Sequence, residues 1–345
     1  FDTGVVIQAA EQRKILLEEV GTDVPATHVI ISHSHGDHAG GIKVWLNDDV
    51  EVIAHTEFQE ELRYLKELET YQHKRNLKFF PWMPDEVADL GPLDWGDATP
   101  TITVDETEDY YTFELGGTQF QVISTPGAEG ADNVVLWLPE QKILFSGDFF
   151  GPQFPQFPNI FTARGEKVRK PVEYIRSLNK IIALKPEMIV PSHFNPTEDA
   201  DQIMADLVKT RDAVAYVHTA VIEGMNAGKD VYQLMREIDL PPELQLPQNH
   251  GRVMWNVRSI WEYYTTWFYQ ESTTELYPVP SSYVYADVAE IAGKQQLTQR
   301  ASERQAAGEP VHALHLIEMA LGQDKNYAPA LEVRKQALTT LLEQA

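Results

Sequence analysis

The chain has 345 residues, 43% of them hydrophobic, so it can bury one large core or two moderate ones. It carries 28 basic and 52 acidic residues, a formal net charge of −24. This charge argues against nucleic acid or an anionic membrane as a partner, because both require basic patches. The sequence contains no cysteine, so any metal must be held by histidine and carboxylate. No apolar run approaches the roughly 20 residues needed to span a bilayer.

The first two hundred residues alternate short β-branched runs with helical stretches. Phe1–Gly4 resembles a strand already in progress, so we expect N-terminal strands and any signal peptide to precede this sequence. A buried strand is predicted over Thr27–Ser32, a short strand over Glu51–Ala54 and an amphipathic helix from Glu57 to Lys74, with an irregular segment over 79–103. Four further strands are predicted over Tyr111–Leu115, Gln119–Ser124, Asn133–Leu138 and Ile143–Ser146. This mixture predicts a sandwich with helices packed outside.

Beyond about residue 196 the strand-like runs disappear. Helical patterns extend over Asp199–Ala227 and Arg252–Gln270, and in the second the apolar residues form one wide stripe. Residues 294–345 resemble a tetratricopeptide-like helix pair. We therefore expect a strand-containing domain over residues 1–200 and an all-α domain over residues 201–345.

A dense group of potential metal ligands follows the Thr27–Ser32 strand. His33 and His35 are two residues apart, where extended backbone points both side chains to one side. Gly36 allows a tight turn, and Asp37 and His38 follow on the next face. Four nitrogen and oxygen ligands within six residues suit Zn²⁺ or a similar metal, and two neighbouring ions satisfy this geometry better than one. The alternative interpretation is a polar surface loop.

The run His-Ser-His-Gly-Asp-His-Ala-Gly-Gly that starts at His33 resembles the signature of the metallo-β-lactamase superfamily. Most of that superfamily has a later Thr-Pro-Gly-His, whereas this chain has Thr-Pro-Gly-Ala-Glu ending at Glu129. A glutamate there is similar to the alkylsulfatase branch. Asp148 in Ser-Gly-Asp matches the position of a bridging carboxylate, although the branch has Glu there, and His193 in Val-Pro-Ser-His matches the last histidine ligand. The fold implied is an α+β, αββα metallo-β-lactamase sandwich.

The resemblance also implies two metal ions, with Zn²⁺ expected and other divalent metals as alternatives. Three ligands are implied for the first ion: His33, His35 and Glu129. Three are implied for the second: Asp37, His38 and His193. Asp148 would bridge the two ions. Catalytic roles are implied for Asp37, Asp148 and Arg164.

Arg164 belongs to a second motif, Asn-Ile-Phe-Thr-Ala-Arg-Gly starting at Asn159, which resembles a sulfate-binding segment of the alkylsulfatases. Asn159 and Arg164 are therefore candidate substrate-binding residues, and the planar guanidinium suits a tetrahedral oxyanion. The Phe- and Pro-rich segment Phe149–Pro158 is expected to shape the mouth of an apolar pocket. His250 falls in a loop, and the sequence leaves open whether its side chain reaches the pocket.

The C-terminal region resembles the helical dimerisation domain of the same branch, notably over Asn256–Trp261. We therefore expect a homodimer that hydrolyses an anionic alkyl sulfate ester with metal-activated water, giving an alcohol and sulfate. The alternatives are a phosphoesterase or lactonase, an iron redox enzyme and a non-catalytic scaffold. The compartment stays undetermined, and the resemblance is compatible with a periplasmic or secreted protein.

Overall fold

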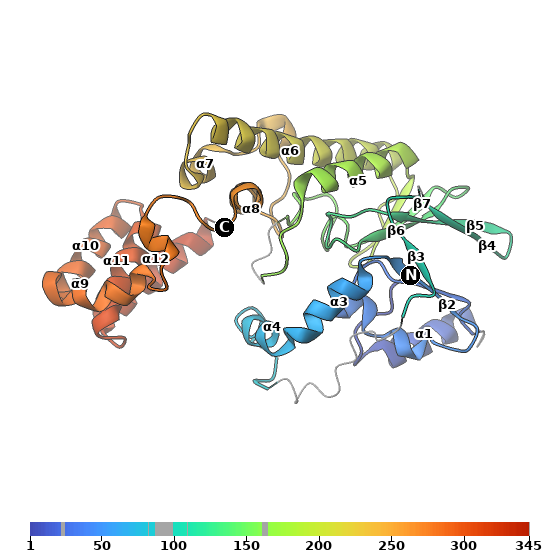
Figure 1. Ribbon diagram of the computed structural model, residues 1–345, viewed down its shortest axis with the longest axis horizontal. Coiled ribbons are helices and arrows are strands. Elements are labelled where there is room, and N and C mark those ends of the chain that lie inside the picture. The colour runs from blue at the N-terminus through green and yellow to red at the C-terminus, as the bar shows by residue number, and fades with distance from the viewer. Residues whose placement is uncertain (22–24, 82, 87–98, 109, 161–164, 345) are drawn as a thin grey trace. The chain divides into compact units, whose positions relative to one another are not determined.

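The computed structural model describes residues 1–345 except 22–24, 82, 87–98, 109, 161–164 and 345 (Figure 1). The chain divides into two compact units, Phe1–Tyr264 and Thr265–Ala345. The division lies well beyond the boundary expected near residue 200. The reason is that the long helix after residue 200 contributes Leu207 and Val214 to the hydrophobic core of the first unit.

The first unit contains two sheets. A parallel three-stranded sheet has the order β1-β2-β3, with strands β1 (His28–Ile30), β2 (Glu51–His55) and β3 (Ile102–Val104). A five-stranded sheet runs from β4 to β8 in sequence order, with strands β4 (Tyr111–Leu115), β5 (Thr118–Ser124), β6 (Val134–Leu138), β7 (Ile143–Gly147) and β8 (Met188–Pro191). Only β7 and β8 are parallel within it. The strands predicted between residues 111 and 146 are confirmed to within one residue at their ends.

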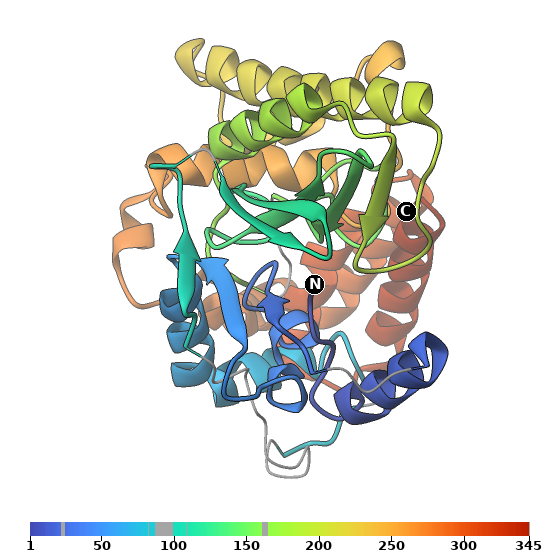
Figure 2. The same ribbon diagram turned by 90° about the vertical axis from the view of Figure 1, so that its right-hand side faces the viewer.

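The alternation of side chains along β1 explains how the layers pack. Ile30 faces the other sheet, where it belongs to a buried cluster with Val122. Val29 and Ile31 face the opposite way and pack against Phe58 of a helix outside the sheet. Figure 2 shows helices on both outer faces of the paired sheets. The predicted αββα sandwich is therefore confirmed.

The helices of the first unit cover these outer faces or connect the strands. They are α1 (Ala9–Val20), α2 (Gly36–Ala39), α3 (Phe58–Glu67), α4 (Glu69–Asn76), α5 (Pro171–Leu184), α6 (Ala200–Asn226), α7 (Val231–Glu237) and α8 (Val253–Thr265). The single helix predicted from Glu57 to Lys74 is wrong, because the chain breaks at Leu68. The helix predicted to reach Gln270 stops at Thr265, since Thr266 takes a left-handed conformation with φ 64°.

Two other expectations need correction. No strand is assigned over Phe1–Gly4, although the Asp2 amide donates to the Ile30 carbonyl at 2.8 Å. The segment expected to be irregular up to Thr103 includes the start of β3, which pairs with β2 in parallel. Among the residues that the structure describes, no helix is long and apolar enough to cross a membrane.

The second unit is helical, with α9 (Tyr285–Ala292), α10 (Lys294–Ala306), α11 (Pro310–Gln323) and α12 (Ala328–Glu343). Its core is built largely from alanines, including Ala301, Ala313 and Ala320, which allow the helices to approach closely. The tetratricopeptide-like character expected for this region stays a prediction.

Candidate metal centre

The segment from His33 to His38 is held by both sheets. After β1 ends, the Ile31 amide donates to the Ile53 carbonyl at 3.0 Å, and the Ser32 carbonyl accepts from the Val134 amide at 2.8 Å. The chain then turns into the short helix α2 at Gly36. The candidate ligands therefore start from backbone that is fixed at the junction of the two sheets.

The first half-site is the group His33, His35 and Glu129, whose potential ligand atoms all lie within 4.8 Å of one another. His33 Nε2 and His35 Nδ1 are 2.9 Å apart, so both rings direct a nitrogen toward one point. Glu129 Oε2 lies 3.9 Å from His35 Nδ1. All three side chains are buried or partly buried. The structure thus brings together the three residues expected to hold the first ion.

Glu129 reaches this position because the loop after β5 turns sharply at Gly127. This glycine has φ 84°, and a Cβ atom there would lie 2.7 Å from the Tyr174 amide nitrogen. A side chain is therefore excluded both by backbone conformation and by the N-terminal end of α5. The Gly127 amide donates to the Gly130 carbonyl at 3.1 Å and closes the turn that carries Glu129.

The second half-site is the group Asp37, His38 and His193, whose potential ligand atoms also lie within 4.8 Å of one another. Asp37 Oδ2 lies 3.5 Å from His38 Nε2 and 3.4 Å from His193 Nε2. This group is more open than the first, since the Asp37 and His193 side chains are 44% and 37% exposed. The three residues expected to hold the second ion are therefore also neighbours.

Asp148 connects the two half-sites. It forms a third potential metal-binding group with His33 and His38, one residue from each half-site. Its position follows from topology: β7 and β8 are parallel and Gly147 pairs with Pro191, so the residues after both strands meet at one edge. Asp148 Oδ2 consequently lies 3.4 Å from His193 Nε2.

The ionisation of these groups differs between the half-sites. Burial lowers the pKa of His33 well below its ordinary value and favours the neutral ring. The carboxylates of Asp148 and Asp37, each 3.4 Å from His193 Nε2, instead raise the pKa of His193 to about 10. Burial opposes ionisation of Asp148, but the rings of His193 and His38 beside its Oδ2 outweigh burial and lower its pKa.

Two buried atoms indicate that a cation fits here. His38 Nε2 and Asp148 Oδ1 have no hydrogen-bond partner in the described part of the chain, although both are shielded from solvent. Buried polar atoms without partners are unfavourable unless something else satisfies them. Histidine nitrogens and carboxylate oxygens at this spacing suit a divalent metal ion. The role of the seven residues as ligands stays a prediction.

Asp2 is an important residue that the sequence did not single out. Its carboxylate accepts from the Ser32 amide at 2.7 Å and from the Ser192 hydroxyl at 2.7 Å, and it lies 2.9 Å from His38 Nδ1. It therefore fixes the ring of His38 from the side opposite to Nε2, as partners of metal-binding histidines commonly do. In the sequence, Asp2 is distinguished only as an acidic residue within the strand-like segment Phe1–Gly4.

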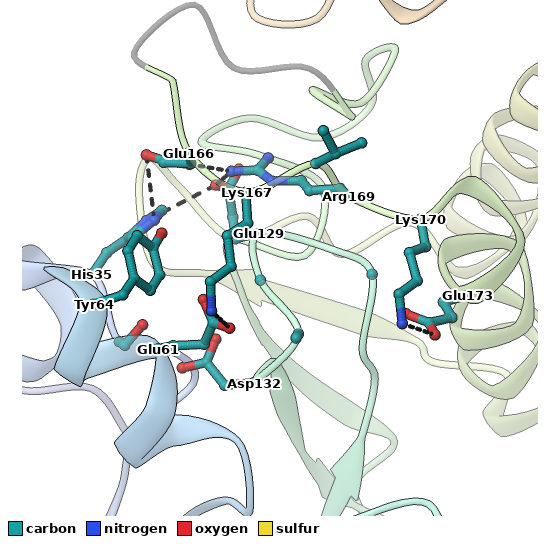
Figure 3. Close-up of a pocket in the computed structure, with 15 residues that line it drawn as sticks. His35, Glu61, Tyr64, Glu129, Asp132, Glu166, Lys167, Arg169, Lys170 and Glu173 are labelled. Carbon is teal, nitrogen blue, oxygen red and sulfur yellow. Dashed lines mark hydrogen bonds and ion pairs between the residues drawn. The ribbon is translucent and has the colours of Figure 1, made fainter. Parts of the chain in front are cut away.

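A second missed group lies beside the first half-site. Arg169 is buried, and its guanidinium donates to Glu129 at 2.5 Å and to Glu166 at 2.9 Å. Figure 3 shows these residues with His35 along the wall of a cavity of about 140 Å³. Arg169, five positions after Arg164 in the sequence, is thus a basic residue that touches a predicted ligand.

Of the two residues predicted to bind the substrate, the structure describes only Asn159. Arg164 lies outside the described residues. Asn159 is buried, and its Nδ2 lies 3.3 Å from His250 Nε2, so His250 reaches the same region as Asn159. The aromatic side chains of Phe149 and Phe157 are fully buried in the core. The expectation that Phe149–Pro158 shapes the mouth of an apolar pocket stays a prediction.

Comparison with known families agrees with this architecture. Residues 1–193, more than half of the chain, match the family described as Metallo-beta-lactamase superfamily, and the chain belongs to this superfamily. Residues 230–345 match a second family, Alkyl sulfatase dimerisation. The chain therefore combines a metallo-β-lactamase domain with a region that matches the alkylsulfatase dimerisation domain, as expected for the alkylsulfatase branch.

Individual relatives cover the whole chain at low identity. A linear primary-alkylsulfatase from Pseudomonas sp. is 27% identical, over 99% of this chain and 67% of the relative. The alkyl/aryl-sulfatase BDS1 of Saccharomyces cerevisiae is 23% identical, over 100% of this chain and 56% of the relative. The structure of the stereoselective inverting sec-alkylsulfatase Pisa1 from Pseudomonas sp. matches with a TM-score of 0.84 at 21% identity, covering 100% of this chain and 58% of that one. The chain thus spans roughly half to two thirds of these relatives' length, and the structural match shows a shared fold.

Proposed function

We propose that this chain is a metal-dependent hydrolase that cleaves alkyl sulfate esters to an alcohol and sulfate. The observation that carries the proposal is the convergence of two histidine–carboxylate groups on Asp148, in a chain that matches both family descriptions. The relatives named alkylsulfatases support sulfate esters as the substrate class. The metal centre alone is compatible with phosphoesters or lactones as well.

The proposed cofactor is a pair of Zn²⁺ ions, because all candidate donors are histidine nitrogens or carboxylate oxygens. His33, His35 and Glu129 would hold one ion, Asp37, His38 and His193 the other, and Asp148 would contact both. Such ions, when bound, polarise the ester and acidify a water molecule near neutral pH.

The remaining chemistry falls to the protein's own side chains. Asp148 stays ionised because His38 and His193 lie against it, so its carboxylate can accept a hydrogen bond from the attacking water and orient it. Asp37 is exposed and ionised beside His193, which places a second acceptor at the open side of the centre. We assign sulfate binding to Asn159 and Arg164, because a protein of net charge −24 needs local cationic groups to attract an anionic ester.

The test is a substrate screen with metal analysis. Purified protein is assayed on primary and secondary alkyl sulfates and on phosphodiesters, and its Zn content is measured on the same preparation. We expect turnover of a sulfate ester with two Zn²⁺ per chain, loss of turnover after chelation, and a strong decrease for Arg164→Ala. Arg63→Ala, on the exposed face of α3, is the matched control. If the protein instead prefers phosphodiesters and Arg164→Ala leaves that activity unchanged, the chain is a phosphoesterase and the proposed function is wrong.

We also propose that the chain forms a homodimer through its C-terminal region. The match of residues 230–345 to the alkyl sulfatase dimerisation family supports this proposal. Light scattering coupled to gel filtration should give about twice the monomer mass of 39.1 kDa. A monomer at all concentrations tested would contradict it.

A further inference from the structure

Arg169 is a buried cation without an assigned role. Its side chain is only 4% exposed, and burial of a guanidinium is unfavourable unless acceptors match its charge; Nη1 and Nη2 have such acceptors, whereas Nε has no hydrogen-bond partner among the described residues. Three acceptors surround it: Glu129 Oε2 and the Asn159 carbonyl, each at 2.5 Å, and Glu166 Oε2 at 2.9 Å. The planar fork of arginine suits this arrangement, because it presents several donors in fixed directions.

The three acceptors connect different parts of the candidate centre. Glu129 belongs to the first half-site. Glu166 places its other oxygen 3.6 Å from His35 Nε2, the ring nitrogen that does not face His33 (Figure 3). Asn159 begins the segment assigned to sulfate binding. A single guanidinium thus contacts one candidate ligand directly, a second through Glu166, and the backbone of the substrate segment.

We propose that Arg169 is a positioning residue for the first half-site. It holds Glu129 Oε2, the oxygen that lies 3.9 Å from His35 Nδ1, in place beside the first half-site, and it keeps Glu166 beside His35 so that the ring directs Nδ1 inward. The contact with Asn159 fixes the start of the substrate segment relative to Glu129. This inference rests on the proposed metal centre, and it assigns to that centre a support that the sequence motif does not include.

Arg169 affects the affinity for a metal ion in two opposite ways. The direction in which the affinity changes when Arg169 is removed therefore distinguishes a positioning role from a charge effect. A cation beside Glu129 repels a metal ion, so by charge alone its removal strengthens metal binding. Loss of fixed geometry weakens binding, typically 10- to 100-fold when a residue that orients a ligand is lost. The proposal requires that geometry dominates.

The charge-matched double variant Arg169→Met/Glu166→Gln isolates geometry, because it removes one cation and one anion together. Metal-free protein is titrated with Co²⁺ against a chromophoric chelator, and the visible spectrum of the bound Co²⁺ is recorded. We expect roughly 10- to 100-fold weaker binding of one of two ions and a changed spectrum for that ion. Arg63→Met/Glu67→Gln removes the same kind of pair from the exposed surface of α3 and should change neither.

Arg169→Lys serves as the second variant, because it keeps the buried charge but cannot contact all three acceptors in the same geometry. It should bind one Co²⁺ ion more weakly than the wild type and raise KM for an alkyl sulfate more than it lowers kcat. If both variants keep wild-type affinity and spectrum while only their melting temperature falls, Arg169 is structural and the proposal is overturned. If the wild type itself binds no Co²⁺, the metal centre is wrong and the role of Arg169 fails with it.

Discussion

The two half-sites of the candidate metal centre each take two residues from the segment His33–His38, yet they are supported in opposite ways. The first half-site is enclosed, its His33 is kept neutral by burial, and a buried guanidinium holds its glutamate. The second half-site is open to solvent, and its His193 is held protonated by carboxylates in the absence of metal. The first half-site resembles a preformed metal site, whereas in the second a metal ion must displace protons.

If two metal ions bind as proposed, this contrast predicts that one motif gives them different affinities. Adjacent residues Asp37 and His38 differ in burial, because Asp37 extends toward solvent while His38 packs between Asp2 and Asp148. We expect tighter binding in the first half-site and exchangeable metal in the second. The following predictions test that ordering.

The largest effect is expected from Asp148→Asn, because this residue contacts members of both half-sites. The substitution removes a charged acceptor and should lower kcat for an alkyl sulfate by roughly 10³-fold or more, as for residues that act as a unit. Zn content should fall toward one ion per chain. Steady-state kinetics and metal analysis measure both, with Asp212→Asn on the surface of α6 as the control. If the variant retains two ions and its activity, Asp148 is neither a metal ligand nor a catalytic residue.

The second prediction concerns pH. His193 has a pKa of about 10 in the metal-free protein, so at pH 7 to 9 a metal ion entering the second half-site must release its proton. Asp2 and the neighbouring carboxylates also raise the pKa of His38, so two rings release protons and affinity there should rise up to roughly 100-fold per pH unit, whereas neutral His33 gives the first half-site a weaker dependence. Calorimetry in buffers of different ionisation enthalpy measures the protons released by each ion. Equal proton release at both half-sites contradicts the contrast.

A smaller effect is expected from Asp2→Asn, which keeps the shape of the side chain but removes the charge that orients His38. Metal binding in the second half-site should weaken about 10- to 100-fold, with little change in the first. The same Co²⁺ titration measures it, and Asp49→Asn in an exposed loop is the control. Equal weakening of both ions would show that Asp2 supports the whole centre.

The smallest effect on the centre is expected from His55→Gln, since His55 lies outside both half-sites and links β2 to β5 through Ser124 Oγ at 3.1 Å. Burial lowers the pKa of His55 to about 4, so below pH 6.5 the unfolded state takes up the proton more readily and stability decreases as pH falls. Urea unfolding of metal-free protein should show the wild type losing about 2 kcal/mol more than the variant between pH 7.5 and 5.0. Metal affinity should not change. An identical pH dependence in both proteins would assign the lost stability to other groups.

The sequence predicted the sandwich and the candidate ligands with different kinds of information. Short runs of strand-forming residues located β4 to β7, although burial differs among these strands and β6 is buried over most of its length. The ligand types in the segment from His33 to His38 were readable because four donors occur within one short stretch. Glu129, Asp148 and His193 were located by resemblance, because the residues next to each of them in the sequence do not indicate a metal ligand.

Some features could not be predicted, because they depend on packing beyond the local pattern. The periodicity of residues 57–74 did not show the break at Leu68. The boundary expected near residue 200 followed the change from strands to helices, whereas α6 packs on the sheet of the first unit through residues such as Leu207. Hydrophobic spacing describes one face of a helix but does not identify the surface that covers it.

The sequence by itself determined which atoms are available to a metal: nitrogen and oxygen donors and no thiolates, with four donors within the six residues from His33 to His38. Only the tertiary structure decided how those donors are supported. Asp2 meets Ser192 across 190 residues of sequence, and Arg169 meets Glu129 across 40. Such contacts exist only after the two sheets and their loops have assembled, because no local propensity of either residue specifies the other.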